Sequence, residues 1–278
     1  MPQENRAPLS PIDRIIRLLI VVLAGLLLLC LVLTCVFFAT KIQSGGREDP
    51  PAADGSDDGD SDGNSSSVTD KVTLPATADA GKKYQDSIVF VGDSLTAHLI
   101  RSGKLSDGKN TKQVWHTENN MLNLNSQVTS AKILYPETGE KMTIAEAAAK
   151  KKPAVLVITL GTDWGVAYLT ETDFKDCYSA LIKDIQAASP DTKIILQSIF
   201  PVTASCPSLD NAKIDNANKW VKAIAADNGC RYLDTQSVLK DDKNCLKAEY
   251  CNSADGIHLH DATYEIVLQY IRTHAWTK

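Results

Sequence analysis

The chain has 278 residues, of which 44% are hydrophobic and 23% are charged, a composition typical of a globular protein. Its formal net charge of -5 provides no basic surface of the kind that a nucleic-acid-binding protein needs, so we expect no nucleic-acid partner. Length alone does not separate one domain from two.

An apolar run lies near the N-terminus. Residues 18–39 read LLIVVLAGLLLLCLVLTCVFFA, without one charge. About 20 apolar residues are enough for a helix to cross a bilayer. A cleaved signal peptide is the competing interpretation, but its apolar core is usually only about 7–15 residues long. We therefore predict a transmembrane helix at residues 18–40, after a cytoplasmic tail at residues 1–17.

Residues 41–72 predict a disordered acidic linker, because the stretch DGSDDGDSDGNSSS has almost no apolar surface to bury and its charges repel one another. A calcium site is the sharper alternative, but the stretch lacks the regular loop spacing and terminal glutamate of an EF-hand. Basic residues are slightly more frequent before the apolar run than after it, which orients the N-terminus inward. We expect a single-pass protein of the cell membrane, with its C-terminal domain outside the cytoplasm.

The remaining residues, 73–278, alternate strand-like and helix-like segments. Short apolar runs predict strands at residues 88–91, 113–116, 154–160, 193–200 and 230–233. Apolar residues at helical spacing, or alanine-rich sequence, predict helices at residues 143–150, 173–188, 209–227 and 262–274. Continuous apolar strands alternating with helices indicate an α/β fold with a parallel sheet covered on both faces. Ligands of such sheets bind at the carboxyl ends of the strands.

Five cysteines lie outside the apolar run, an odd number, so at least one does not pair within the chain. Cys245 and Cys251 are close enough in sequence to form a disulfide that would stiffen the loop before residue 255. We expect such a bridge if the domain lies in an oxidising compartment.

The first predicted strand ends in VFVGDSLT, residues 89–96. A serine at such a strand-to-helix turn presents its hydroxyl to the cleft, and its own N–H can help to bind an oxyanion. Ser94 is therefore a candidate nucleophile. The simpler alternative is that Ser94 only caps a helix.

Two further motifs follow strands or precede the last helix. GTDWG, residues 161–165, follows the third predicted strand, and DGIHLH, residues 255–260, precedes the C-terminal helix. Asp255 and His258 are three residues apart, so the carboxylate can orient the imidazole that accepts the serine proton. His258 and His260 could instead bind a metal, although no third ligand is evident in the sequence.

Together these motifs resemble the SGNH/GDSL hydrolase family over residues 88–276. The resemblance implies Ser94 as nucleophile, His258 as general base and Asp255 as its partner. It also implies a three-layer α/β/α fold with a central parallel sheet, preceded here by the transmembrane helix. The reaction it implies is ester hydrolysis without a metal or organic cofactor.

The sequence departs from the family pattern at two positions that supply oxyanion donors. The usual glycine after the second strand is missing from WHTENNMLNLNS, residues 115–126, and a backbone N–H of Asn119 or Asn120 could replace it. The usual asparagine of the third-strand motif is Asp163 here. An ionised Asp163 would oppose an oxyanion, because it accepts hydrogen bonds and donates none. A protonated Asp163 could donate one.

Asp93 and Trp164 are expected to contact the substrate, and Trp115 is expected at the same rim, where an aromatic face suits a sugar ring. The leading hypothesis is an extracytoplasmic serine esterase that removes acyl groups, in the first place acetyl, from a cell-surface or extracellular polysaccharide or another small ester. The alternatives are an O-acyltransferase with the same triad and a carbohydrate-binding module that has lost catalysis.

Overall fold

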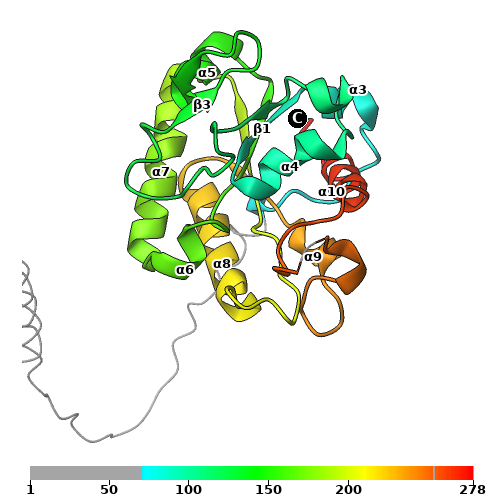
Figure 1. Ribbon diagram of the computed structural model, residues 1–278. Helices are drawn as coiled ribbons and strands as arrows, with labels where there is room; N and C mark the ends of the chain where they lie inside the picture. Colours follow the sequence, from blue (N-terminus) through cyan, green and yellow to red (C-terminus); the bar gives the residue numbers. More distant parts are fainter. Residues whose placement is uncertain (1–70, 253, 278) are drawn as a thin grey trace, which may run out of the picture. The chain divides into compact units, whose positions relative to one another are not determined.

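The computed structural model describes residues 71–252 and 254–277. A five-stranded sheet forms the centre of this domain (Figure 1), with strand order β2-β1-β5-β6-β7 and every pairing parallel. Its strands are β1 (Ile88–Gly92), β2 (Val114–Trp115), β5 (Val155–Thr159), β6 (Lys193–Gln197) and β7 (Arg231–Leu233). A separate antiparallel hairpin pairs β3 (Lys132–Leu134) with β4 (Lys141–Thr143). The predicted α/β fold with a central parallel sheet is confirmed.

Helices cover both faces of the sheet (Figure 1). The helices α5 (Ile144–Lys151), α7 (Glu171–Ala188) and α8 (Asn211–Asp227) contribute to one apolar cluster. The helices α3 (Gly81–Asp86), α4 (Ser94–Ser102), α9 (Gln236–Leu239) and α10 (Thr263–Arg272) contribute to the other. The short helix α6 (Gly165–Tyr168) follows β5. The arrangement is the expected three-layer α/β/α sandwich.

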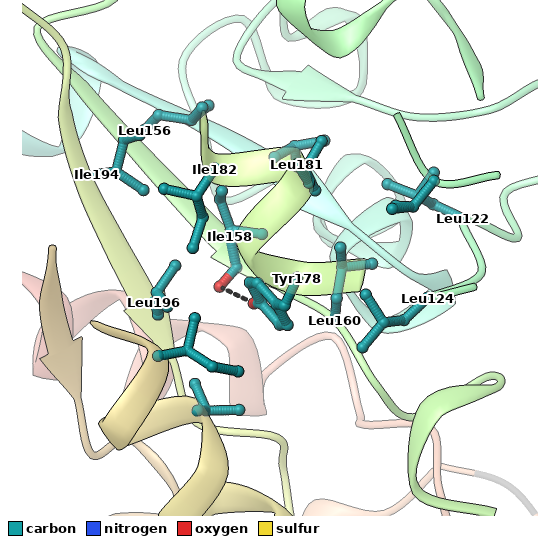
Figure 2. Packing of buried hydrophobic residues seen from close by; sticks show 14 of the residues in the cluster. Leu122, Leu124, Leu156, Ile158, Leu160, Tyr178, Leu181, Ile182, Ile194 and Leu196 are labelled. Atoms are coloured by element: carbon teal, nitrogen blue, oxygen red, sulfur yellow. Dashed lines mark hydrogen bonds between the residues drawn. The ribbon is translucent and has the colours of Figure 1, made fainter. Parts of the chain in front are cut away.

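The alternation of side chains along each strand produces the two clusters. Val89 and Val91 of β1 pack into the first cluster, whereas Ile88 and Phe90 pack into the second. Both β1 and β5 are buried along their whole length, which explains their unbroken apolar sequence. Figure 2 shows the first cluster, where the Tyr178 hydroxyl of α7 donates a hydrogen bond to the backbone oxygen of Ile158 at 3.4 Å.

The order in which strands are added to the sheet reverses at β1. From β1 the chain runs first to β2 on one side, and β5 then pairs on the other side, with Gly92 opposite Thr159. In open α/β sheets, the crevice at such a switch point is where ligands bind. The residues that follow β1 and β5, among them Ser94 and Asp163, therefore meet at one edge of the sheet.

The N-terminal limit of the folded domain differs slightly from the expectation. Val72, which the sequence assigned to the linker, is buried, and the N–H of Leu74 donates to the backbone oxygen of Tyr232 in β7 at 2.9 Å. The predicted cytoplasmic tail, the transmembrane helix and residues 41–70 of the linker lie outside the described residues. Within residues 71–252 and 254–277, no helix combines the length and apolarity that a membrane span requires.

Candidate active site

The turn that carries Ser94 leaves no room for a side chain at Gly92. A Cβ there would lie 2.1 Å from the backbone oxygen of Thr159 and 2.3 Å from the Thr96 hydroxyl. Asp93 caps α4, accepting the N–H of Leu95 at 3.3 Å, so the helix begins with Ser94. Ser94 is half-buried at the carboxyl end of β1. This is the position that the sequence predicted for the nucleophile.

His258 and Asp255 come to Ser94 from a turn before α10. The Nε2 atom of His258 lies 3.2 Å from Ser94 Oγ, and its Nδ1 atom lies 2.7 Å from Asp255 Oδ2. The other carboxylate oxygen of Asp255 accepts the backbone N–H groups of Ile257 and His258. With the Nδ1 proton donated to Asp255, Nε2 presents a lone pair to the serine hydroxyl. The three predicted catalytic residues are therefore within hydrogen-bonding distance in the order that acyl transfer requires.

Gly256 fixes the turn between these two residues. Its φ angle is +74°, and a Cβ would lie 2.4 Å from Thr203 Oγ1. The backbone oxygen of Gly256 accepts the N–H of Thr203 at 2.9 Å. The catalytic turn is thus held against residues 203–206 by a contact that only glycine allows.

His98, to which the sequence analysis assigned no catalytic role, lies one helical turn after Ser94. Its ring lies 4.6 Å from the ring of His258, centroid to centroid. Burial, with a smaller contribution from the charge of Arg101, lowers the pKa of His98 to about 4. A neutral imidazole therefore packs against the candidate base. The spacing of four residues from Ser94 was the available signal.

Asp163 makes the closest contacts with Ser94. Its Oδ1 atom accepts the Ser94 hydroxyl at 2.9 Å, and its Oδ2 atom accepts the Ser94 backbone N–H at 3.0 Å. That N–H is the group expected to bind an oxyanion. A carboxylate that accepts both hydrogens of Ser94 occupies the position that the oxygen of a tetrahedral intermediate would need.

The structure corrects the role of Asp93. This residue is fully buried, so it does not reach a substrate. Its Oδ2 atom instead accepts the N–H of Thr162 at 3.1 Å, which ties the loop after β5 to the start of α4. Burial first, and the neighbouring charge of Asp163 second, raise the pKa of Asp93 to about 7. Asp93 therefore positions the loop that bears Asp163.

We expect Asp93 to make the free energy of unfolding depend on pH. A folded-state pKa of about 7 lies above the ordinary value of 3.8, so the native protein holds a proton that the unfolded chain releases. The contribution is fully present below about pH 4 and is lost as pH rises towards 7, by at most a few kcal/mol. Urea unfolding of the wild type and Asp93→Asn at pH 4, 5.5, 7 and 8.5 measures it. The difference between the two proteins should change over that interval, and a constant difference would contradict the assignment.

The two asparagines predicted to supply an oxyanion donor lie in a turn that forms hydrogen bonds of its own. The N–H of Asn120 already donates to the backbone oxygen of Thr117 at 3.0 Å. The side chain of Asn119 accepts from Thr117 Oγ1 and from the N–H of Met121. Both asparagines lie in an exposed turn that closes on itself. Further along the chain, Leu124 is the residue that approaches the loop after Asp163, since its Cδ2 atom would lie 3.3 Å from a Cβ on Gly165.

The two tryptophans expected at the rim, Trp164 and Trp115, differ in their burial. Trp164 follows Asp163 and its exposed fraction is 40%, in agreement with a place at the rim. Trp115 is fully buried in the core, because β2 turns its side chain into the first apolar cluster. The expectation that Trp115 lines the rim was therefore wrong.

The structure also bears on the expected disulfide and on a possible metal site. Cys177, Cys206, Cys230 and Cys245 carry free thiols, so the expected bridge between Cys245 and Cys251 is absent. In the part of the chain that the structure describes, no three His, Cys, Asp or Glu side chains gather closely enough to hold a metal ion.

Several solved structures are similar to this chain. A GDSL-like lipase from Bacteroides thetaiotaomicron is 18% identical, with a TM-score of 0.47 and coverage of 74% of this chain and 93% of the lipase. The periplasmic domain of a lipopolysaccharide acetyltransferase from Salmonella ser. Paratyphi A is 15% identical, with a TM-score of 0.46 and coverage of 75% and 87%. An acetylxylan esterase from Geobacillus stearothermophilus is 14% identical, with a TM-score of 0.40 and coverage of 73% and 97%.

No curated protein matches the sequence. The family comparison is decisive, because residues 90–266, well over half of the chain, match the GDSL-like lipase/acylhydrolase family. The matched segment contains Ser94, Asp163, Asp255 and His258. The chain therefore belongs to the GDSL-like lipase/acylhydrolase family, whose members hydrolyse esters.

Proposed function

We propose that the protein is an extracytoplasmic serine esterase that removes acyl groups, in the first place acetyl, from a cell-surface or extracellular polysaccharide. One observation carries the catalytic part of the proposal: Ser94 Oγ lies 3.2 Å from His258 Nε2, and His258 Nδ1 lies 2.7 Å from Asp255 Oδ2. A hydroxyl, an imidazole and a carboxylate in this order can form and hydrolyse an acyl-enzyme.

In the first half of the reaction, Ser94 Oγ attacks the ester carbonyl while His258 Nε2 takes the hydroxyl proton. The carbonyl oxygen becomes an oxyanion near the backbone N–H of Ser94. Asp163 must first move away, because it accepts both that N–H and the hydroxyl hydrogen that His258 takes. Asp255 stabilises the imidazolium through Nδ1–H. When the intermediate collapses, the bond to the alcohol oxygen breaks and His258 returns its proton to that oxygen.

In the second half, water attacks the acyl-Ser94 ester. His258 accepts a proton from the water, and the bond to Ser94 Oγ then breaks. The proton returns to Oγ, and the carboxylic acid leaves. The cycle ends with the enzyme unchanged and needs no group other than the triad and a donor for the oxyanion.

Exposure of the triad supports a large substrate. The side chain of His258 is 25% exposed and that of Asp255 is 42% exposed, so an ester that projects from a polymer can approach them from solvent. Acetyl is the proposed acyl group because acetyl esters are common on polysaccharides outside the cytoplasm. The location itself is a proposal that rests on the apolar run at residues 18–39.

The substrate proposal is tested with purified full-length protein in detergent. We expect release of acetate from acetylated xylan, and turnover of p-nitrophenyl acetate at least about 10-fold faster than that of p-nitrophenyl octanoate. Faster turnover of the octanoyl ester, with no acetate released from the polymer, would indicate a lipase and contradict the proposal.

The membrane proposal has its own test. We expect the full-length protein to stay with the membrane fraction after carbonate washing, because an uncharged helix of about 20 residues is held by the bilayer core. Release of a shortened soluble form that begins within residues 41–72 would instead indicate a cleaved signal peptide.

A binding module without catalysis is the second candidate, and Asp163 is the observation that favours it. Its carboxylate accepts both the hydroxyl and the N–H of Ser94. Loss of one oxyanion donor typically lowers turnover by about 100- to 1000-fold. The response to Asp163→Asn, given in the Discussion, separates the two candidates.

A further inference from the structure

Two exposed aromatic rings follow Asp163 in the chain. Trp164 and Tyr168 have exposed fractions of 40% and 68%, and their ring centroids lie 4.5 Å apart with a 31° tilt. They stand at the two ends of α6, which is only one turn long. The two rings pack against each other, and neither residue belongs to a core cluster.

Tyr168 also lines a cleft between α6 and the start of α8, which lie side by side in Figure 1. The cleft has a volume of about 390 Å³, and its lining consists of Ala167, Tyr168, residues 207–210 and Lys213. Sites for small organic ligands usually measure about 300–1,000 Å³. The volume therefore lies in the range of sites for a small organic ligand such as a monosaccharide unit. We name this feature the α6–α8 cleft.

Both walls of the α6–α8 cleft connect directly to the candidate catalytic residues. On one side, α6 begins immediately after Asp163 and Trp164, and Asp163 accepts the Ser94 hydroxyl. On the other side, residues 203–206 lead into the lining segment 207–210. The space for a Cβ on Gly256, next to Asp255, is filled by Thr203 Oγ1 at 2.4 Å and by the Cα of Cys206 at 3.0 Å.

Of the two charged residues that line the α6–α8 cleft, only Lys213 is available to a ligand. Asp210 is engaged as the N-cap of α8, where it accepts the N–H of Ala212 at 2.7 Å. Lys213, in the first turn of α8, is exposed and forms no ion pair with any described residue. An ammonium group with three donors in the same cleft as the Tyr168 ring matches a sugar ring that has an apolar face and hydroxyl groups at its edge.

We propose that the α6–α8 cleft is a carbohydrate subsite that binds the pyranose unit next to the one bearing the ester. The ring of Tyr168 stacks on the apolar face of the pyranose, and Lys213 donates to its hydroxyl oxygens. This inference rests on the proposed polysaccharide esterase function and extends it, because it assigns the substrate a second anchor besides the ester itself.

The test compares a substrate that has sugar units with one that has none. Full-length wild type, Tyr168→Ala and Lys213→Ala are assayed on partially O-acetylated cellotetraose and on p-nitrophenyl acetate. Lys183→Ala on α7 is the matched control, because Lys183 is also exposed and forms no ion pair with the described residues. Tyr168→Phe is a second control, because it retains the aromatic ring.

We expect Tyr168→Ala to lower kcat/KM on the oligosaccharide by about 10-fold through a higher KM, with a change of less than about 2-fold on the small ester. Lys213→Ala should act in the same direction, and the two other variants should resemble wild type.

Binding provides a readout that does not depend on esterase activity. Cellotetraose, xylotetraose and chitotetraose are titrated into wild type and Tyr168→Ala by calorimetry. Binding of one of them that weakens in Tyr168→Ala supports the subsite, even if wild type hydrolyses no ester, in which case the esterase function alone fails. If wild type hydrolyses p-nitrophenyl acetate but binds none of the three, or if Tyr168→Ala loses activity equally on both substrates, the subsite is overturned while the esterase function stands.

Discussion

We expect Ser94→Ala to lower ester turnover by about 10⁶-fold, to the level that binding without a nucleophile sustains. Ser94 Oγ is the atom that forms the covalent bond, and it lies 3.2 Å from His258 Nε2, the group that takes its proton. His258→Ala should cost about as much, since it removes the group that takes the proton. Asp255→Asn should cost less, about 10⁴-fold, because the base survives while its orientation suffers. Initial rates with p-nitrophenyl acetate measure all three.

Ser102→Ala is the matched control for this series. Ser102 ends the same helix, where its hydroxyl donates to the backbone oxygen of Leu99 at 2.7 Å. Its substitution should leave turnover within about 2-fold of wild type. Circular dichroism should show each variant folded, because none of the substitutions removes a residue of the apolar core. Undiminished turnover in Ser94→Ala would remove the enzymatic interpretation altogether.

Asp163→Asn should have the opposite effect and raise kcat/KM by about 100-fold. Both carboxylate oxygens of Asp163 lie within hydrogen-bonding distance of Ser94, where an oxyanion would need a donor. An amide removes the negative charge beside the developing oxyanion and supplies an N–H donor in its place. Oxyanion donors are typically worth about 100- to 1000-fold in turnover, and the expected gain is the lower end of that range. The pH profile of kcat/KM on p-nitrophenyl acetate, measured for both proteins, gives the result.

The control for this substitution is Asp176→Asn, which makes the same chemical change at an exposed residue of α7 and should leave activity unchanged. A second readout comes from stability. The charge of Asp163 contributes to the raised pKa of Asp93, so removing it should shift the pH dependence of unfolding to lower pH. A fall in activity at every pH would mean that the carboxylate of Asp163 takes part in catalysis. Unchanged activity would mean that Asp163 does not limit turnover.

Much of the fold followed from the sequence because its signals are local. The unbroken apolar runs at residues 88–91 and 154–160 predicted buried parallel strands, and the structure has β1 and β5 there. The apolar spacing at residues 173–188 predicted α7 within two residues of its start. The hairpin of β3 and β4 was not predicted, because three-residue strands leave too short a pattern to detect.

Some residues of the candidate site were also identified from local sequence, whereas the placement of others was not. The identities of Ser94, Asp255 and His258 were readable because each lies in a short motif next to a strand end or a helix start. The burial of Asp93 and Trp115 was not, since the local sequence of a strand end does not tell which side chain turns inward. The expected bridge between Cys245 and Cys251 failed for a related reason, because closeness in sequence does not fix the separation of two side chains in space.

By itself the sequence determined the class of fold, the candidate nucleophile, base and acid, and the presence of a carboxylate where the family usually has an amide. Only the tertiary structure decided that β5 pairs directly with β1, which brings Asp163 onto both hydrogens of Ser94. It alone placed the ring of His98 against His258, and Tyr168 and Lys213 in the lining of one cleft. The physical reason is that periodicity and motifs report what each segment buries, whereas the distance between groups from different segments is set by strand order, register and the packing of helices on the sheet.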